Sequence, residues 1–377
     1  MQRSGIREIM DLAAGRADVL HLEVGQPDFP TPNHVIDAAC RAAHDGYTTY
    51  TANKGLREVR ESMSAKLERD NGISADPDNL VITCGAVNAL LESLVATVSP
   101  GDSILVPDPG WPNYEMMADV LDARVVRYPL VPEEGFVPDL DRLEQIVSAT
   151  DRAKAIIINS PGNPTGAVFP ETVIERLVEI ALRAGVYLLS DECYEQIVFE
   201  GRHLSPGSLD HEGRVISVFS LSKSYAMTGW RVGYVTGDPE LMELVAKVQE
   251  PLISCATSIA QKAAQAALEG DQACVREMTA AYRNRRDMVV DILRAGDLLV
   301  TVPSGAFYVL ADISRATTDS YGFARWLIEE HGVAVAPGQT FGPAGAGMVR
   351  LSLATNTDDL REGSERLVRA VSGWGHP

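Results

Sequence analysis

A lysine that follows an apolar run is the residue whose type and position most clearly suggest a chemical role. Lys223 comes directly after the run 215–219 and the triplet Ser-Leu-Ser. A lysine at the end of a buried strand needs a partner, because removing an ammonium group from water is costly. Its amine could be a Schiff-base nucleophile whose pKa is lowered by a cation such as Arg231, or it could pair with a structural carboxylate.

Three other segments also place small or polar residues directly after apolar runs. Gly85 and Ala86 precede a stretch of helical period, so their backbone amides could bind a phosphate or could simply allow tight packing. Asp191 ends a second run, where its carboxylate could pair with a ring cation or cap a helix. The segment SPGNPTG at 160–166 follows a third run. Together with Lys223, these segments offer an amine, a carboxylate, an amide, hydroxyls and free backbone N–H groups.

Alternating strands and helices must position these residues. Seven apolar runs are expected to form a mostly parallel sheet, because most of them are apolar on both faces. They are 80–84, 103–107, 124–128, 155–158, 186–189, 215–219 and 232–236. Segments of helical period such as 87–98 and 171–184 lie between several runs, which indicates an α/β fold. Because ligands bind beyond the carboxyl ends of such strands, we expect the four polar segments to meet at one binding rim.

The remaining regions predict helices and a second, smaller unit. The spacing of Ile6, Ile9, Met10 and Ala13 predicts an amphipathic N-terminal helix. Further helices are expected at 238–270, 271–295 (one or two), 321–331 and 357–371, and strands at 306–310, 333–336 and 348–354. A chain of 377 residues exceeds the usual size of one core. We therefore expect a large α/β domain over residues 40–280 and a small α+β domain built from 1–39 and 281–377.

Composition excludes several classes of function. The chain carries 33 Lys+Arg against 52 Asp+Glu, a net charge of −19, which argues against binding to nucleic acid or anionic membranes. No apolar run approaches the roughly 20 residues that span a bilayer, and the charged N-terminus does not resemble a signal peptide. The five cysteines form no CxxC pair, which indicates reduced thiols and a cytoplasmic location. Scattered histidines and the lack of HExxH argue against a metal site.

The residues around Lys223 also fit a competing motif. Ser220-Leu221-Ser222-Lys223 matches SxxK, the nucleophile motif of penicillin-binding proteins and serine β-lactamases. The SDN and KTG motifs of those enzymes are absent from the sequence, which disfavours that interpretation. No strand is followed by GxGxxG and no GxxxxGK[ST] occurs, which disfavours a Rossmann dehydrogenase and P-loop chemistry.

The ordered set of motifs resembles the class I aminotransferases, pyridoxal-phosphate enzymes of fold type I. The resemblance covers nearly the whole chain through nine segments. They are VGQPDFPTP (24–32), YTANKGLREVR (50–60), TCGAVNAL (83–90), DPGWPNYE (108–115), NSPGNPTG (159–166), DECYEQIVFEG (191–201), SLSKSYAMTGWRVGY (220–234), PSGAFYVLADI (303–313) and GMVRLSLAT (347–355). It implies a homodimer with shared active sites that transfers the amino group of an L-amino acid to a 2-oxo acid by a ping-pong mechanism.

The resemblance also assigns chemical roles. Lys223 would hold the cofactor covalently and then move a proton between substrate and cofactor. Asp191 would keep the pyridine nitrogen protonated, so that the ring can accept electrons. Asn163 and Tyr194 would bind the ring hydroxyl oxygen, and Trp111 would stack on the ring face.

Binding of the cofactor phosphate and of the substrate carboxylate is implied in the same way. The phosphate would be held by Gly85, Ala86, Ser220, Ser222 and Arg231, with Tyr50 reaching the phosphate of the neighbouring subunit. The substrate would be held by Arg350, whose planar fork grips the α-carboxylate, and by Gly25 and Asn163.

One departure from the family pattern concerns the substrate. Relatives active on aspartate often carry a lysine where this chain has Val87, and valine cannot pair with a distal carboxylate. Lys54, Arg16 and Arg127 are other candidate cations. We therefore expect an apolar or aromatic donor rather than strictly aspartate, with 2-oxoglutarate or pyruvate as acceptor. A pyridoxal-phosphate lyase on the same scaffold is the alternative, and a non-catalytic regulator of this fold is a further one.

Overall fold

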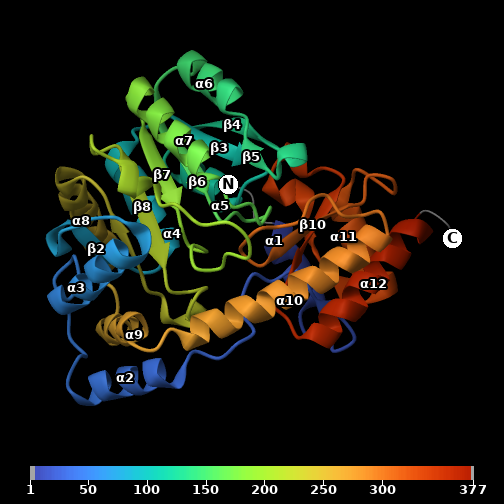
Figure 1. Ribbon diagram of the computed structural model, residues 1–377, viewed down its shortest axis with the longest axis horizontal. Helices are drawn as coiled ribbons and strands as arrows, with labels where there is room; N and C mark the ends of the chain where they lie inside the picture. Colours follow the sequence, from blue (N-terminus) through green and yellow to red (C-terminus); the bar gives the residue numbers. More distant parts are fainter. Residues whose placement is uncertain (1–4, 375–377) are drawn as a thin grey trace.

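The computed structural model describes residues 5–374, and its largest element is an eight-stranded sheet with the order β2-β9-β8-β7-β6-β3-β4-β5 (Figure 1). The strands are β2 (Leu80–Thr83), β3 (Ser103–Asp108), β4 (Arg124–Val131), β5 (Val137–Pro138), β6 (Ala153–Asn159), β7 (Tyr187–Asp191), β8 (Val215–Ser220) and β9 (Gly233–Thr236). All of them except β5 and β9 share one direction. The predicted mostly parallel α/β sheet is confirmed, and β5 is an additional strand of two residues, too short to show a period.

Helices cover both faces of this sheet, which explains the continuous apolar runs. The helices α4 (Ala86–Thr97), α5 (Asn113–Val120) and α8 (Pro239–Ile253) pack on one face with Ile104, Val106 and Ile157. The helices α6 (Leu140–Ala149) and α7 (Glu171–Ala184) pack on the other face with Leu105, Ile156 and Ile158. Because successive strand residues point to opposite faces, a strand buried on both sides has no polar alternation.

A further helical layer packs beside β2 and β9. It contains α2 (Asn33–His44), α3 (Arg57–Lys66) and α9 (Ser258–Glu269), whose apolar residues share one core with Phe219 and Tyr234. The prediction of one helix over 238–270 is wrong, because α8 ends at Ile253 and Ser254 takes a left-handed φ of 63°. Pro251 in the last turn of α8 has no N–H to continue the helical hydrogen bonds, so the chain turns there before α9.

The C-terminal region forms a smaller α+β unit. Its three-stranded antiparallel sheet has the order β10-β13-β12, and β1 (Leu20–His21) pairs with β11 (Val333–Ala334). The other elements of this unit are β10 (Tyr308–Asp312), β12 (Ala336–Pro337), β13 (Met348–Ser352), α11 (Ser320–His331) and α12 (Thr357–Gly373). The predicted strand at 333–336 is therefore two short strands in different sheets.

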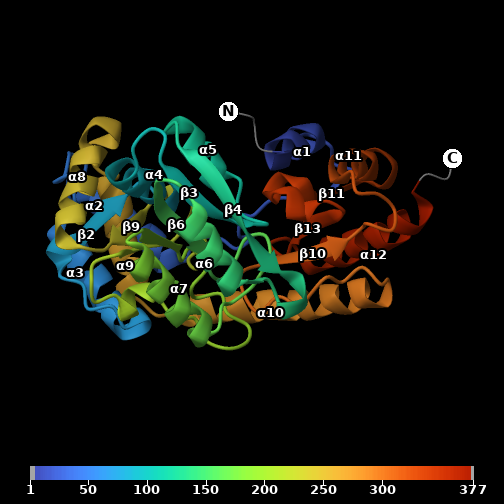
Figure 2. The ribbon, with the colours of Figure 1, turned by 90° about the horizontal axis from the view of Figure 1, so that it is seen from above.

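Two further helices pack on this smaller unit, and one of them joins it to the rest of the chain. Helix α10 (Ala273–Ala295) is one continuous helix that runs from beside α9 to α12 (Figure 1). Helix α1 (Gly5–Ala13) lies against α11, as Figure 2 shows, with Ile9 and Ala13 fully buried. The predicted N-terminal amphipathic helix is thus confirmed. The remaining short helices are η1 (Leu67–Asn71), η2 (Pro77–Asn79), η3 (Pro132–Glu134), η4 (Pro206–Leu209), η5 (Thr228–Trp230), η6 (Gly338–Phe341) and η7 (Pro343–Gly345).

Between residues 5 and 374, no helix has both the length and the apolar character needed to cross a membrane. The five cysteines are free thiols.

A buried carboxyl group in α4 makes the stability of the fold depend on pH. Glu92 is fully buried, and its only hydrogen bond among the described residues is from Asn88 Nδ2 to Oε1, at 2.9 Å. Burial raises the pKa of Glu92 from 4.5 to about 7. Between pH 4.5 and about 7, the folded protein keeps the Glu92 proton while the unfolded chain loses it. The free energy of unfolding therefore falls as the pH rises across this range.

Replacing Glu92 with glutamine is expected to stabilise the protein at high pH. At pH 8.5 the free energy of unfolding should rise by roughly 2–3 kcal/mol, because no buried charge forms, whereas below pH 5 it should change little. Denaturant unfolding at both pH values measures the difference, with exposed Glu175→Gln as the control. An equal effect of Glu92→Gln at the two pH values would contradict the assignment.

Candidate active site

The predicted binding rim forms one cavity between the large sheet and the C-terminal unit. The segments that follow β2, β3, β6, β7 and β8 all leave the same edge of the sheet, and Arg231, which precedes the antiparallel β9, reaches that edge too. The cavity is lined by Ile6, Gly25, Ala86, Val87, Trp111, Asn159, Asn163, Asp191, Cys193, Tyr194, Ser220, Ser222, Lys223, Thr228, Arg231, Tyr308 and Arg350.

Most of the predicted site residues are brought together here. Gly85 is not among the residues that line the cavity, but its backbone packs against Arg231. A Cβ atom on Gly85 would lie 2.6 Å from Nη2 of Arg231. Tyr50 is not part of the cavity, because its side chain is 87% exposed on the surface. The predicted role of Tyr50 in a neighbouring subunit stays a prediction.

Lys223 directs its amine into the cavity. Its Nζ donates a hydrogen bond to the carbonyl oxygen of Gly25 at 2.7 Å and lies 6.0 Å from the ring centre of Tyr194. Burial lowers the pKa of this amine, and the positive charges of Arg350 and Arg231 add to the shift. A lower pKa increases the neutral fraction, and only the neutral amine can attack a carbonyl.

Asp191 offers a buried carboxylate on the opposite side of the same cavity. Its Oδ2 accepts a hydrogen bond from the Tyr114 hydroxyl at 2.7 Å, and its Oδ1 accepts one from the Cys193 thiol at 3.0 Å. Burial raises the pKa of Asp191, although these hydrogen bonds oppose the rise. Within residues 5–374 no lysine, arginine or histidine forms an ion pair with it. A buried carboxylate of this kind is stabilised by a cationic ligand atom.

A group of donors at the start of α4 can hold an anion. Ala86 is the first residue of α4, so its backbone N–H lies at the positive end of that helix. Arg231 donates from Nη2 to the Cys84 carbonyl at 3.1 Å, which keeps the guanidinium beside that helix start. The hydroxyl of Ser220 accepts from the backbone N–H of Ser222 at 3.1 Å, which orders the loop before Lys223.

Arg350 is prepared to bind a carboxylate. It is 1% exposed, and its Nη1 and Nη2 donate to Asn163 Oδ1 at 2.8 Å and to the Glu23 carbonyl at 2.6 Å. Its Nε is buried and has no hydrogen-bond partner among the described residues. The guanidinium carbon lies 4.2 Å from the ring centre of Tyr308, which holds the planar group in place. A carboxylate ligand would satisfy the unpaired donor and offset the cost of burying the charge.

Several functional positions were not predicted as site residues. Tyr308 and Cys193 lie inside segments that match the family pattern, but neither carries a signal of its own in the sequence. Ile6 reaches the cavity from α1, and only the packing of α1 on the C-terminal unit brings it there. Tyr114 contacts Asp191 from below the cavity, and Asn159 and Thr228 complete the lining.

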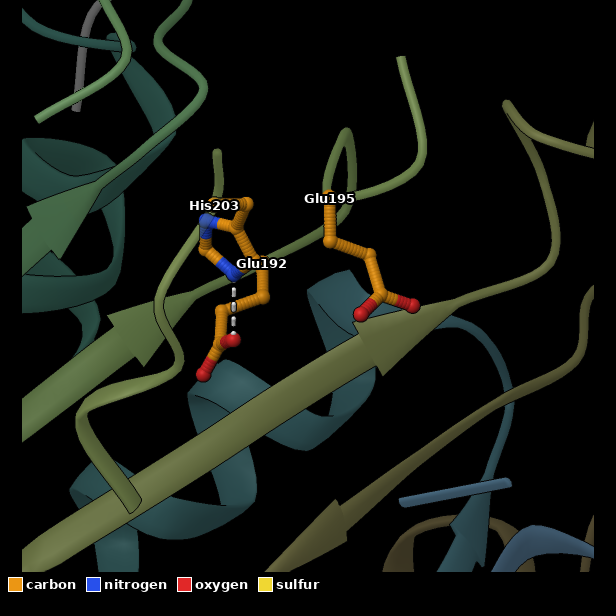
Figure 3. A group of neighbouring side chains, drawn as sticks. All are labelled: Glu192, Glu195 and His203. Carbon is orange, nitrogen blue, oxygen red and sulfur yellow. Dashed lines mark hydrogen bonds and ion pairs between the residues drawn. The ribbon is translucent and has the colours of Figure 1, made fainter. Parts of the chain in front are cut away.

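A cluster of titratable side chains follows β7 and does not line the cavity (Figure 3). Glu192, Glu195 and His203 place one potential ligand atom each within 4.8 Å of one another, and His203 Nε2 lies 2.8 Å from Glu192 Oε2. Lys66 forms a buried ion pair with Glu195, and Asn71 donates to its other oxygen. Because a protein cation already neutralises Glu195, we do not assign a metal to this cluster.

The donors of the cavity fit pyridoxal phosphate. Lys223 could supply an amine for the aldehyde carbon, Asp191 a carboxylate for the ring nitrogen, and Arg231 with the start of α4 a site for the phosphate. Trp111 supplies an aromatic face at the cavity wall.

Comparisons with known proteins show which family and which folds this chain resembles. Residues 17–367 match the family model described as aminotransferase class I and II. The aspartate/prephenate aminotransferase of Thermus thermophilus is 41% identical over 365 residues, covering 96% of this chain and 93% of that protein. The solved structure of Thermus thermophilus aspartate aminotransferase with maleate has a TM-score of 0.93 at 40% identity, covering 98% and 97% of the two chains. An aromatic aminotransferase from Pyrococcus horikoshii has a TM-score of 0.91 at 36% identity, covering 97% and 98%.

Proposed function

The chain belongs to the aminotransferase class I and II family and is a pyridoxal-phosphate-dependent transaminase, and on this basis we propose that its amino donor is an apolar or aromatic L-amino acid. The acceptor is a 2-oxo acid such as 2-oxoglutarate or pyruvate. The observation that carries this proposal is the composition of the cavity wall, which is apolar where a donor side chain would lie.

The cations of the cavity support this choice of substrate. Of the described residues that line it, three are cationic, and each already has a role, with Lys223 at the cofactor, Arg231 at the phosphate and Arg350 at the α-carboxylate. The other candidate cations are ion-paired elsewhere: Lys54 with Glu243, Arg16 with Asp18 and Arg127 with Glu115. None of these three lines the cavity, whereas Ile6, Val87 and Trp111 do. A second carboxylate on the substrate therefore has no partner among the described residues of this subunit.

We assign the chemical steps to residues of this chain. Arg350, helped by Asn163 and the Gly25 backbone, binds the α-carboxylate and orients the substrate Cα–H bond toward Lys223. Lys223 Nζ would accept the proton from the substrate Cα and return it when the 2-oxo acid is converted. When bound, pyridoxal phosphate supplies an electron-withdrawing ring that stabilises the charge left at Cα. With the cofactor bound, Asp191 would keep the ring nitrogen protonated, Tyr194 and Asn163 would donate hydrogen bonds to the ring oxygen, and Trp111 would lie against the ring.

The phosphate site anchors the cofactor. The phosphate would be held by Arg231, the hydroxyls of Ser220 and Ser222, and the backbone N–H groups at Gly85 and Ala86. In support, all of these except Gly85 line the cavity, and Ala86 is the first residue of α4. Packing of the C-terminal unit over the cavity would exclude water from the proton-transfer step.

We also propose that the enzyme is a cytoplasmic homodimer with shared active sites. Tyr50 is a large side chain that is almost fully exposed, and Leu244 and Leu252 of α8 expose further apolar area. In the dimer, Tyr50 would contact the phosphate of the neighbouring subunit. The free cysteines support a reducing compartment. We retain residues 40–280 as the large domain and residues 1–39 and 281–377 as the small domain.

Introducing a cation at Val87 is expected to change the substrate preference. Val87 is 39% exposed and faces the cavity, so a lysine there could reach a distal carboxylate at modest cost. Val87→Lys should raise kcat/KM for aspartate by about 10–100-fold, the effect of one charge-assisted hydrogen bond. It should lower kcat/KM for phenylalanine. Steady-state assays with both donors measure the ratio, and Val87→Met is the control of similar length without charge. Equal ratios in Val87→Lys and Val87→Met would contradict the proposed position of the donor side chain.

A visible absorption spectrum tests the proposed donor. The protein loaded with pyridoxal phosphate is mixed with individual amino acids, and the band of the lysine-bound cofactor is followed. Loss of the band with apolar or aromatic donors, and its return with a 2-oxo acid, is the expected result. A much faster reaction with aspartate than with any other donor would overturn the substrate proposal. Release of ammonia without an acceptor would contradict transamination.

A further inference from the structure

Two tyrosine hydroxyls meet between the large sheet and the C-terminal unit. Tyr194 follows β7, whereas Tyr308 begins β10, and their hydroxyl oxygens are 2.9 Å apart. Both side chains are at least 95% buried and their rings pack edge to face, with centres 5.7 Å apart. The hydrogen bond therefore joins a residue at the cofactor side of the cavity to a residue on the sheet that carries Arg350.

Tyr308 also contacts the residues that bind the substrate. Its ring lies against the Arg350 guanidinium, and its neighbour on β13 is Ser352, two residues from Arg350. Its hydroxyl is pressed against Gly25, where a Cβ would lie 2.1 Å from the oxygen. Gly25 in turn accepts the hydrogen bond from Lys223. The Tyr308 hydroxyl therefore contacts both the Gly25 backbone, which accepts the hydrogen bond from Lys223, and the Tyr194 side chain, which we place at the cofactor's ring oxygen.

We propose that Tyr308 is a positioning residue that donates its hydroxyl proton to Tyr194, so that the proton of Tyr194 is directed at the cofactor's ring oxygen. This inference rests on the proposed function of the cavity. Each tyrosine hydroxyl has one proton to donate. When Tyr194 donates to the ring oxygen, the bond between the two tyrosines can persist only with Tyr308 as its donor. The chain of two hydrogen bonds strengthens the donor at the ring oxygen.

Three titratable or charged groups lie near this pair. Arg350 and the Cys193 thiol act on both hydroxyls, and Lys223 Nζ lies 6.0 Å from the centre of the Tyr194 ring. Tyr308→Phe keeps the ring that packs on Arg350. The variant therefore removes the hydrogen bond to Tyr194 and the contact between the hydroxyl and Gly25.

The expected result is a shift in the pH titration of the visible band of the cofactor on Lys223. Donors at the ring oxygen stabilise its anionic form, so Tyr308→Phe should raise the midpoint by about 0.5–1 pH unit, the effect of weakening one hydrogen bond. Tyr282→Phe is a matched control, since the Tyr282 hydroxyl belongs to the same aromatic cluster and has no hydrogen-bond partner among the described residues. The control should titrate like the wild type.

A double variant distinguishes an effect of Tyr308 that acts through Tyr194 from an effect that does not. Tyr194→Phe should raise the midpoint more than Tyr308→Phe does, and the Tyr194→Phe/Tyr308→Phe protein should titrate like Tyr194→Phe alone. Additive shifts, or an unchanged midpoint in Tyr308→Phe, would overturn the inference while leaving the proposed function intact. A wild-type protein that forms no band with pyridoxal phosphate would overturn both, whereas a band that does not titrate would overturn only the inference. Thermal unfolding of the variants, measured alongside, shows that the shifts do not arise from loss of the fold.

Discussion

Replacing Lys223 with alanine is expected to slow transamination by about 10⁴-fold or more, because the variant loses both the covalent attachment of the cofactor and the group that moves the proton. The amine has no substitute among the described residues of the cavity. Arg350 and Arg231 are the other cations that line it, and an arginine does not deprotonate in a protein. Single-turnover kinetics of both half-reactions measure the loss.

Two comparisons isolate the role of the Lys223 amine. Lys223→Arg keeps a positive charge near Gly25 but offers no nucleophile, so it should be as inactive as Lys223→Ala. The surface variant Lys154→Ala should retain full activity. Phosphate binding at Arg231 and the start of α4 does not need the amine, so Lys223→Ala should still bind the cofactor non-covalently, without the band of the lysine-bound form. Retention of that band in Lys223→Ala would show that another amine holds the cofactor.

The large sheet could be predicted from the sequence because its strands are buried on both faces. The run 155–158 is apolar throughout and the run 215–219 is apolar except for Ser217, and each lies in a strand of the structure. The errors occur where local pattern and tertiary contacts disagree. The segment 238–270 is helical in period, but Pro251 and the left-handed Ser254 divide it. The segment 333–336 is one apolar run, yet β11 pairs with the N-terminal β1 and β12 pairs with β13.

The site residues that could be predicted are those that follow the strands of one sheet. Asp191, Lys223 and Asn163 meet because parallel strands end at one edge. Tyr308 and Ile6 could not be assigned, because they reach the cavity from a second sheet and from the N-terminal helix. Their positions depend on how the C-terminal unit packs over the rim, and no local periodicity encodes that packing.

The second large effect is expected at Asp191. Asp191→Asn keeps the size of the side chain but removes its charge, so the protonated ring nitrogen would lose its buried counter-charge. Breaking a buried ion pair costs roughly 3–5 kcal/mol, which corresponds to a fall in kcat of about 10²–10⁴-fold. Both carboxylate oxygens of Asp191 accept hydrogen bonds, from Tyr114 and from Cys193. An asparagine N–H₂ group cannot accept, so at least one of these two hydrogen bonds must be lost or reversed.

The decrease should appear in proton abstraction rather than in substrate binding, since Arg350 and Asn163 remain in place to hold the α-carboxylate. Asp191→Asn should therefore lower kcat with little change in substrate affinity, and the primary isotope effect of Cα-deuterated substrate should increase. Asp102→Asn is the control for loss of a buried carboxylate elsewhere, because Asp102 pairs with Arg152 at the start of β3. It should lower thermal stability and leave kcat unchanged. An equal decrease of kcat in both variants would mean that Asp191 acts through the fold and not at the cofactor.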